Sequence, residues 1–240
     1  GNTSKTKVAC MNSVISFDLA GRVPIVLAAT GHRVIPKQDE EALCNAVNGE
    51  LNLIAKSNPH SPCILISALA EGADRLVANC ALNLGWQLCT VLPLTQDDYE
   101  TDFRDDASVA EFRELLTRST WVKVIDPKHH LRPACYHELG LWLSQQAQVL
   151  IALWDGEQAK GPGGTAEVIQ NFREGVALAQ PILPDAGPVI HIQTRQTLIQ
   201  KSRADVEVGR VRMLPASPGG LPSDGEANRW RVVLSRIDNF

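Results

Sequence analysis

Long apolar runs and broad basic patches are both missing from this sequence. No stretch of about 18 uncharged apolar residues occurs, so nothing has the length of a membrane-spanning helix, and no signal peptide is visible. The formal net charge is -4, and no stripe of Lys and Arg with interleaved aromatic residues is present. A mildly acidic chain lacks the basic field that attracts nucleic acid. We therefore expect no nucleic-acid partner and no membrane contact by this segment.

Cysteine and metal-ligand patterns are also sparse. The six cysteines form no C-x-x-C pair, and several lie in apolar runs, such as Cys63 within residues 62–66. Such cysteines are typical of buried, reduced thiols, which predicts a cytoplasmic protein without disulfides. His129 and His130 have no neighbours at metal-ligand spacing, so we expect no metal. No lysine follows the glycines of residues 161–164, which disfavours P-loop chemistry, and Ser67 lacks the G-x-S-x-G context of a hydrolase nucleophile.

What the sequence has is an alternation of short apolar runs and amphipathic stretches. Residues 149–154 are apolar at every position, as in a central strand covered on both faces. Alternating strands and helices indicate βαβ units and a parallel sheet. The sequence therefore predicts an α/β fold, a Rossmann-like, doubly wound, mainly parallel sheet flanked by helices in three layers. The strands are expected at residues 24–29, 63–67, 87–92, 121–125, 149–154 and 188–192, and the helices at 38–56, 73–84, 108–118, 134–146 and 165–178.

The pattern also suggests a division of the chain. We expect an N-terminal extension at residues 1–22, a nucleotide-binding domain at 23–193, and a linker-like C-terminal extension at 194–240, which contains the Pro- and Gly-rich run 215–222. The chain ends at Phe240 without a turn signal. From this we expect a further domain to follow in a longer parent protein.

The strongest motif is the glycine-rich segment 161–167, which lies between a buried strand and a helix. Gly163 and Gly164 would let the backbone approach a phosphate, and the free N–H groups at the helix start would face it. Thr165 could cap the helix or donate to a phosphate oxygen. Glu167 would point toward a cleft. The simpler interpretation is a plain loop followed by a capped helix.

Two earlier loops follow strands in the same way. In the first, Gly31 permits a tight turn, His32 could hydrogen-bond a ligand, and Arg33 offers a planar fork suited to phosphate. The alternative is a surface arginine and a loop histidine. Because ligands bind outside the carboxyl ends of parallel strands, these loops are expected to share one site.

The second loop, residues 67–75, is rich in small residues. Ser67, Ala68 and Gly72 would allow close approach of a ligand, and Glu71 could accept a hydrogen bond from ribose hydroxyls. For Asp74 we favour a structural role at a salt-bridged helix start.

Two further positions complete the candidate site. Tyr136, at a helix start, could stack on a base or be a rim aromatic. Asp155 closes the central strand.

Taken in order, these loops resemble the SLOG superfamily, which includes the SMF/DprA proteins and the LOG enzymes. The resemblance is carried by Gly-His-Arg at 31–33, Ser-Ala-Leu-Ala-Glu-Gly-Ala-Asp at 67–74, Leu-Trp-Asp-Gly at 153–156 and Gly-Gly-Thr-Ala-Glu at 163–167. It implies a Rossmann-like sheet that binds nucleotides or nucleotide-derived ligands. The LOG enzymes are phosphoribohydrolases, which makes Glu167 the catalytic candidate if the chain is an enzyme, but Val168 stands where their second Glu would be.

The combination of loops is most similar to the SLOG sensor domains of bacterial conflict systems. That resemblance implies a nucleotide-derived, and in some cases NAD-derived, signalling ligand, no other cofactor, self-association into a homo-oligomer, and a membrane or effector domain in the parent protein. Our first hypothesis is therefore a sensor domain. The alternative is a LOG-like N-glycosidase acting on nucleoside monophosphates or NAD-type substrates. A structural module or a DprA-like binder of single-stranded DNA is the third, which the net charge disfavours.

Overall fold

The computed structural model describes residues 22–125, 131–157, 164–174, 187–195 and 206–214. A seven-stranded sheet with the order β4-β3-β2-β1-β5-β6-β7 forms its centre, and β1 to β6 run parallel. The strands are β1 (Ile25–Gly31), β2 (Cys63–Ser67), β3 (Gln87–Leu92), β4 (Trp121–Val124), β5 (Val149–Trp154), β6 (Val189–Gln193) and β7 (Val211–Leu214). The predicted Rossmann-like α/β fold is confirmed.

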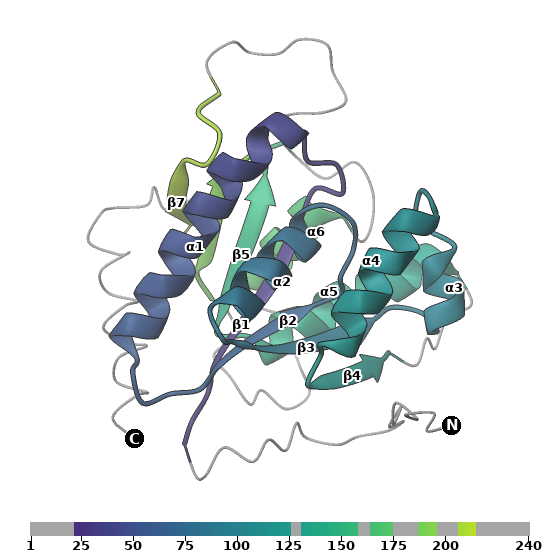
Figure 1. Cartoon of the computed structure of the whole chain (residues 1–240), viewed down its shortest axis with the longest axis horizontal. Helices are drawn as coiled ribbons and strands as arrows, with labels where there is room; N and C mark the ends of the chain where they lie inside the picture. Colours follow the sequence, from purple (N-terminus) through teal and green to yellow (C-terminus); the bar gives the residue numbers. More distant parts are fainter. Residues whose placement is uncertain (1–21, 126–130, 158–163, 175–186, 196–205, 215–240) are drawn as a thin grey trace.

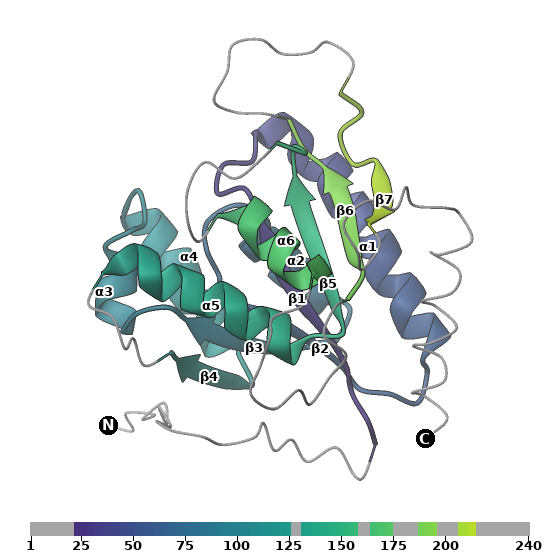
Figure 2. The ribbon, with the colours of Figure 1, turned by 180° about the vertical axis from the view of Figure 1, so that it is seen from behind.

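Helices cover both faces of this sheet. Figure 1 shows α1, α2 and α4 on the near face, and Figure 2, from behind, shows α5 and α6 on the other. The helices are α1 (Glu40–Ser57), α2 (Ala73–Asn83), α3 (Gln96–Glu100), α4 (Asp106–Thr117), α5 (Arg132–Gln146) and α6 (Thr165–Glu174), with a 3-10 turn η1 (Lys37–Asp39) before α1. The three layers follow from the strands, since a strand that is apolar on both sides must be covered on both sides.

Successive residues of β1 divide between two cores. Leu27 and Ala29 pack with α1, α2 and α4, whereas Ala28 packs with α5 and α6. All three side chains are buried. The alternation of a strand's side chains thus builds one apolar layer on each face of the sheet.

The direction of the strand order changes in the middle of the sheet. From β1 the chain proceeds through β2 and β3 to β4 on one side, and then returns to β5 and β6 on the other. The reversal leaves a crevice outside the carboxyl ends of β1 and β5, the place where open α/β sheets bind ligands. A ligand-binding site is therefore expected at the loops that follow β1, β2 and β5.

Two elements differ from the sequence expectations. β7 pairs antiparallel with β6, so the sheet extends beyond residue 193, where we expected a linker-like extension to begin. Its four residues are only partly buried or exposed, which left no strong periodicity to detect. The short helix α3 lies between the strand expected at residues 87–92 and the helix expected at 108–118, where no element was expected.

The cysteines are consistent with reduced thiols. Cys80, Cys89 and Cys135 are buried free thiols, and Cys44 and Cys63 are half-buried free thiols. Burial raises the pKa of the Cys89 thiol to about 12, so it stays protonated.

Candidate functional site

A cleft of about 470 Å³ opens at the reversal of strand order. It is bounded by the carboxyl end of β1, the loop after β2, one face of α5 and the start of α6. Its lining residues are Ala29, Thr30, Gly31, His32, Arg33, Ala68, Ala70, Asp74, Tyr99, Tyr136, Leu139, Gly140, Leu143, Gly164, Thr165 and Val168. Residues far apart in the sequence thus meet at the crevice predicted by the topology.

The residues that follow β1 are held between β5 and α2 by backbone hydrogen bonds. His32 N donates to Leu153 O at 3.1 Å, and Ala73 N donates to His32 O at 3.0 Å. A Cβ on Gly31 would lie 2.4 Å from the Ala73 Cβ and 2.6 Å from Leu153 O. The glycine is therefore required by the packing of α2 against β5, whatever it contributes to ligand approach.

The loop after β2 holds an unusual backbone. Leu69 is a buried non-glycine residue with a positive φ of 56°, a conformation that is uncommon for such residues and accumulates at functional loops. The Ser67 hydroxyl accepts a hydrogen bond from Leu69 N at 3.0 Å, and Arg75 Nε donates to Leu69 O at 3.0 Å. Ser67 is thus a buried positioning residue for this loop.

Arg33 lies at the mouth of the cleft and is oriented by Tyr136. Its Nη2 donates to the Tyr136 hydroxyl oxygen at 3.2 Å, and its guanidinium lies 5.6 Å from the centre of the Tyr136 ring. The Tyr136 hydroxyl in turn donates to Asp102. Burial and the bond to Asp102 raise the pKa of Tyr136 to about 12, which keeps the hydroxyl protonated. A cation is therefore pre-positioned beside the cleft.

Two buried polar groups form the floor. Burial raises the pKa of the Asp74 carboxyl to about 7, although hydrogen bonds from the backbone of Ala70 and Ala68 oppose the shift. The Tyr99 hydroxyl is fully buried and has no hydrogen-bond partner among the described residues. Leaving such a group unpaired costs about 1–3 kcal/mol. Within a cleft, an unpaired hydroxyl marks a place for a polar ligand atom or an ordered water.

The start of α6 faces the same cleft with backbone amides. Glu167 N and Val168 N bond to Gly164 O, at 3.0 and 3.1 Å. The amides of Thr165 and Ala166 precede these bonds and have no acceptor within the helix. Together with the helix dipole, they favour an anion at this end of the cleft.

One wall of the cleft is apolar. Leu139, Leu143 and Val168 line it, and Gly140 lets α6 approach α5, since a Cβ there would lie 3.0 Å from Val168 Cγ2. A cleft that offers a cation, free helix amides and an apolar wall matches a molecule with a phosphate and a flat, weakly polar ring.

The predicted site residues separate into two groups. Seven of them line the cleft: Gly31, His32, Arg33, Ala68, Tyr136, Gly164 and Thr165. Five others lie elsewhere: Ser67, Glu71, Gly72, Asp155 and Glu167. Gly163 and the His129–His130 pair lie outside the described residues.

The residues outside the cleft have other contacts. Glu71 and Gly72 line a second hollow on the α4 side of α2. Asp155 N donates to His32 Nε2 at 3.1 Å, so Asp155 orients a residue of the lining. Glu167 Oε1 lies 2.7 Å from His137 Nδ1, a pair that links α6 to α5. The carboxylate is therefore engaged at the rim.

Nine of the lining residues were not predicted from the sequence, and Asp74 and Tyr99 are the two of them with ionisable side chains. We favoured a salt-bridged helix start for Asp74: it does lie in the first turn of α2, but it makes no ion pair in the described part of the chain, and its carboxyl is buried at the cleft floor. Tyr99 lies between the strand expected at residues 87–92 and the helix expected at 108–118, where the sequence analysis placed no element. Its place in an otherwise acidic stretch was the available signal.

Solved structures of DNA processing proteins are similar to this chain. The first is the X-ray structure of DNA processing protein A (DprA) from Streptococcus pneumoniae, at 18% identity and a TM-score of 0.42, over 70% of this chain and 53% of that chain. The second is DNA processing protein A from Helicobacter pylori, at 15% identity and a TM-score of 0.43, over 70% of this chain and 71% of that one. The match thus spans about half the length of the Streptococcus protein. At these identities the likeness concerns the fold alone.

No protein-family model matches the sequence, and no curated protein matches it. The Helicobacter protein binds single-stranded DNA, which contradicts our expectation that nucleic acid is excluded as a partner. The expectation rested on net charge, and an overall -4 averages over the chain while Arg33 and Arg104 line one hollow, so net charge alone does not exclude nucleic acid.

Among the described residues, no helix combines the length and apolar character needed to cross a bilayer. Within the same residues, no group of three or more His, Cys, Asp or Glu side chains is placed to hold a metal ion.

Proposed function

We propose that the cleft binds a nucleotide or a nucleotide-derived ligand, and that the chain is the sensor domain of a larger protein. The observation that carries this proposal is the convergence of Arg33, the start of α6 and an apolar wall on one cleft at the reversal of strand order. A phosphate fits Arg33 and the start of α6, and a nucleobase fits the apolar wall.

The residues at the floor of the cleft favour a binding function over a catalytic one. Asp74 and Tyr99 are buried hydrogen-bonding groups, one of them without a partner in the described structure, and they can specify a polar ligand atom. The catalytic candidate, Glu167, is bonded to His137 at the rim and is absent from the lining. A sensor that binds without consuming its ligand is the function that these placements favour, in line with the resemblance to conflict-system SLOG domains.

The experiment is a thermal-shift screen followed by product analysis. The panel is AMP, ADP, ADP-ribose, cyclic ADP-ribose, NAD, cyclic dinucleotides and a short single-stranded oligonucleotide. A ligand at 100 times its Kd adds about 2.7 kcal/mol of stability, which is easily measured. A ligand recovered intact supports the sensor. A ligand that is consumed, with loss of turnover in Glu167→Gln, establishes the hydrolase instead. No shift with any member contradicts the proposal.

Signalling requires that binding change something that a neighbouring domain can detect. We propose a change in self-association, to be measured by light scattering coupled to size-exclusion chromatography with and without the best ligand. An oligomeric state that is the same in both samples contradicts this step and leaves ligand binding standing.

Arg33→Ala is expected to weaken AMP binding by about tenfold or more. A hydrogen bond to a charged group contributes about 1.5–3 kcal/mol, and Arg33 is the arginine that lines the cleft in the described structure. Titration calorimetry measures the change. The matched control is Arg113→Ala, because Arg113 bonds to Glu100 and lines neither hollow. Equal affinity in Arg33→Ala and the control contradicts the assignment.

A further inference from the structure

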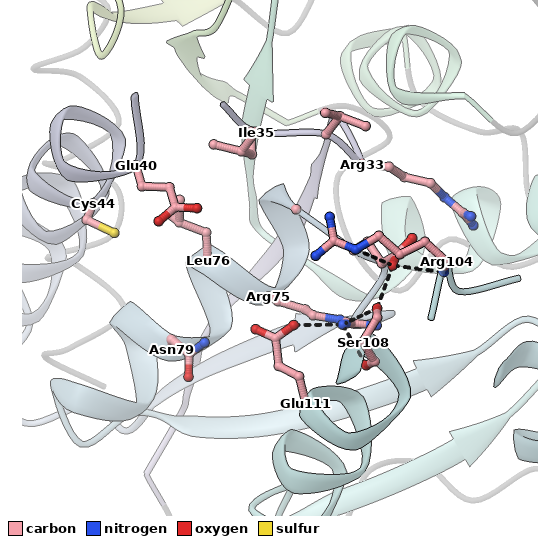
Figure 3. Close-up of a pocket in the computed structure, with 13 residues that line it drawn as sticks. Arg33, Ile35, Glu40, Cys44, Arg75, Leu76, Asn79, Arg104, Ser108 and Glu111 are labelled. Atoms are coloured by element: carbon pink, nitrogen blue, oxygen red, sulfur yellow. Dashed lines mark hydrogen bonds and ion pairs between the residues drawn. The ribbon is translucent and has the colours of Figure 1, made fainter. Parts of the chain in front are cut away.

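A second hollow lies on the other side of the start of α2. It has a volume of about 310 Å³ and is enclosed by α1, α2, α4 and the segment after β1. Figure 3 shows Glu40 and Cys44 of α1 opposite Leu76 and Asn79 of α2. Arg33 lines this hollow as well as the cleft. The two spaces therefore meet at the residue assigned to phosphate.

Arg75 is a lining residue of this hollow, and its guanidinium is turned toward Ser108 and Glu111 of α4 (Figure 3). The Arg75 side chain is buried, with the residue 2% exposed, and its guanidinium carbon lies 4.6 Å from the centre of the Phe103 ring. Its Nη1 donates to Glu111 Oε2 at 2.8 Å and to Ser108 O at 2.9 Å (Figure 3), but its Nη2 has no partner among the described residues. A buried, charged donor that is left unpaired is costly, so a small shift of the lining that lets a bound acceptor reach Nη2 would be stabilising.

Two other lining side chains make no hydrogen bond or ion pair with another described residue. Glu40 offers carboxylate acceptors, and Asn79 offers both a donor and an acceptor. Leu76 and Ile35 supply apolar surface between them. A nucleobase has this mixture, with ring nitrogens that accept, amino groups that donate, and a flat face that packs on aliphatic side chains.

We infer that the hollow is a second nucleoside subsite, so that the natural ligand consists of two nucleosides joined through phosphate, with the linking phosphate at Arg33. One nucleoside occupies the cleft and the other occupies the hollow between α1 and α2. The inference rests on the proposed function, since it needs a phosphate at Arg33. It adds the size class of the ligand and the residues that select it.

The test compares one-nucleoside and two-nucleoside probes by titration calorimetry: AMP, NAD with its pyrophosphate link, and the dinucleotide pApA with its phosphodiester link. At least one of the two larger probes is expected to bind at least about tenfold more tightly than AMP, a difference of about 1.4 kcal/mol. If only NAD binds more tightly than AMP, the natural ligand resembles a dinucleotide cofactor. If pApA binds more tightly than AMP, the natural ligand resembles a nucleic-acid fragment. Either gain supports the second subsite.

Asn79→Phe fills the hollow and is expected to bring the two-nucleoside probe to within about threefold of AMP, with AMP affinity unchanged. Asn83→Phe is the matched control, because Asn83 is exposed on the same helix and lines neither space. Glu40→Ala, at an exposed position, is a second variant and is expected to reduce the gain in the same direction.

The outcomes separate the two claims. If AMP binds and neither larger probe gains, the second subsite is wrong and nucleotide binding stands. If the gain survives in both Asn79→Phe and Glu40→Ala, the second subsite is also wrong. If no probe binds the wild-type chain, the proposed function fails and this inference fails with it.

Discussion

Replacing Gly72 by alanine should destabilise the protein by about 3 kcal/mol or more. Gly72 has φ +76° and ψ -116°, a region open to glycine and strained for other residues. A Cβ there would lie 2.4 Å from Arg33 O and 2.5 Å from His32 O. Both neighbours are backbone atoms of the β1 exit loop, so relief of the clash requires this loop to move away from α2. Overpacking alone costs about 1–3 kcal/mol, and the backbone strain adds to it.

Thermal and urea denaturation measure this effect. For a chain of this size, about 3 kcal/mol lowers Tm by about 6–12 °C. Gly49→Ala is the matched control, since Gly49 lies within α1 and a Cβ there meets nothing within 4 Å. That substitution should stabilise the helix by about 0.5–1 kcal/mol. Gly72→Ala should also weaken AMP binding, because it displaces Arg33. A Gly72→Ala protein with the Tm of the wild type would show that the loop does not have this conformation.

Asp74→Asn should change the pH dependence of both stability and binding. Burial raises the pKa of Asp74 in the folded state from 3.8 to about 7. Between those values the folded state holds a proton that the unfolded state has lost, so stability falls as pH rises from 4 to 7. The upper bound on this loss is about 4 kcal/mol. Asparagine keeps the shape and the acceptor for the backbone but does not ionise, so the variant should lack this loss.

Urea denaturation of the wild type and Asp74→Asn at pH 5 and pH 8 tests the stability effect. The variant should be the more stable of the two at pH 8, with a smaller difference at pH 5. Parallel pH profiles for the two proteins would show that Asp74 ionises normally. Asp98→Asn is a suitable control, because Asp98 lies at an exposed position on α3.

Ligand binding should respond in the same pH window. An anion in the cleft is repelled by ionised Asp74, so the affinity for ADP-ribose should fall by up to about tenfold between pH 6 and pH 8. ADP-ribose is the appropriate probe, because its pyrophosphate does not titrate in this range. In Asp74→Asn the affinity should be nearly constant. An equal fall in both proteins would place the titrating group elsewhere.

The order of strands and helices could be predicted from the sequence because it rests on local periodicity. The apolar run of β5 and the amphipathic pattern of α1 each reflect burial within one element. The loop after β1 could be assigned to the site for a related reason, since the carboxyl ends of parallel strands share an edge. Gly31 and Arg33 were identified in this way.

The remaining parts depend on contacts between distant segments. Asp74 reads as an ordinary helix-start carboxylate, and its unusual pKa arises only because the fold buries it at the cleft floor, where Tyr99 also lies. Arg75 looks like the salt-bridge partner of a neighbour, whereas in the fold it reaches Ser108 and Glu111 on α4. Glu71 follows the motif, yet it faces the second hollow because Gly72 turns the chain. No local pattern reports these tertiary placements.

The most direct test of the central claim is a crystal structure of the chain soaked with AMP. Our account predicts the phosphate within about 3 Å of the Arg33 guanidinium and the first amides of α6, with the adenine ring against Leu139, Leu143 and Val168. AMP bound outside this cleft, or a cleft that stays empty at saturating AMP, would contradict it.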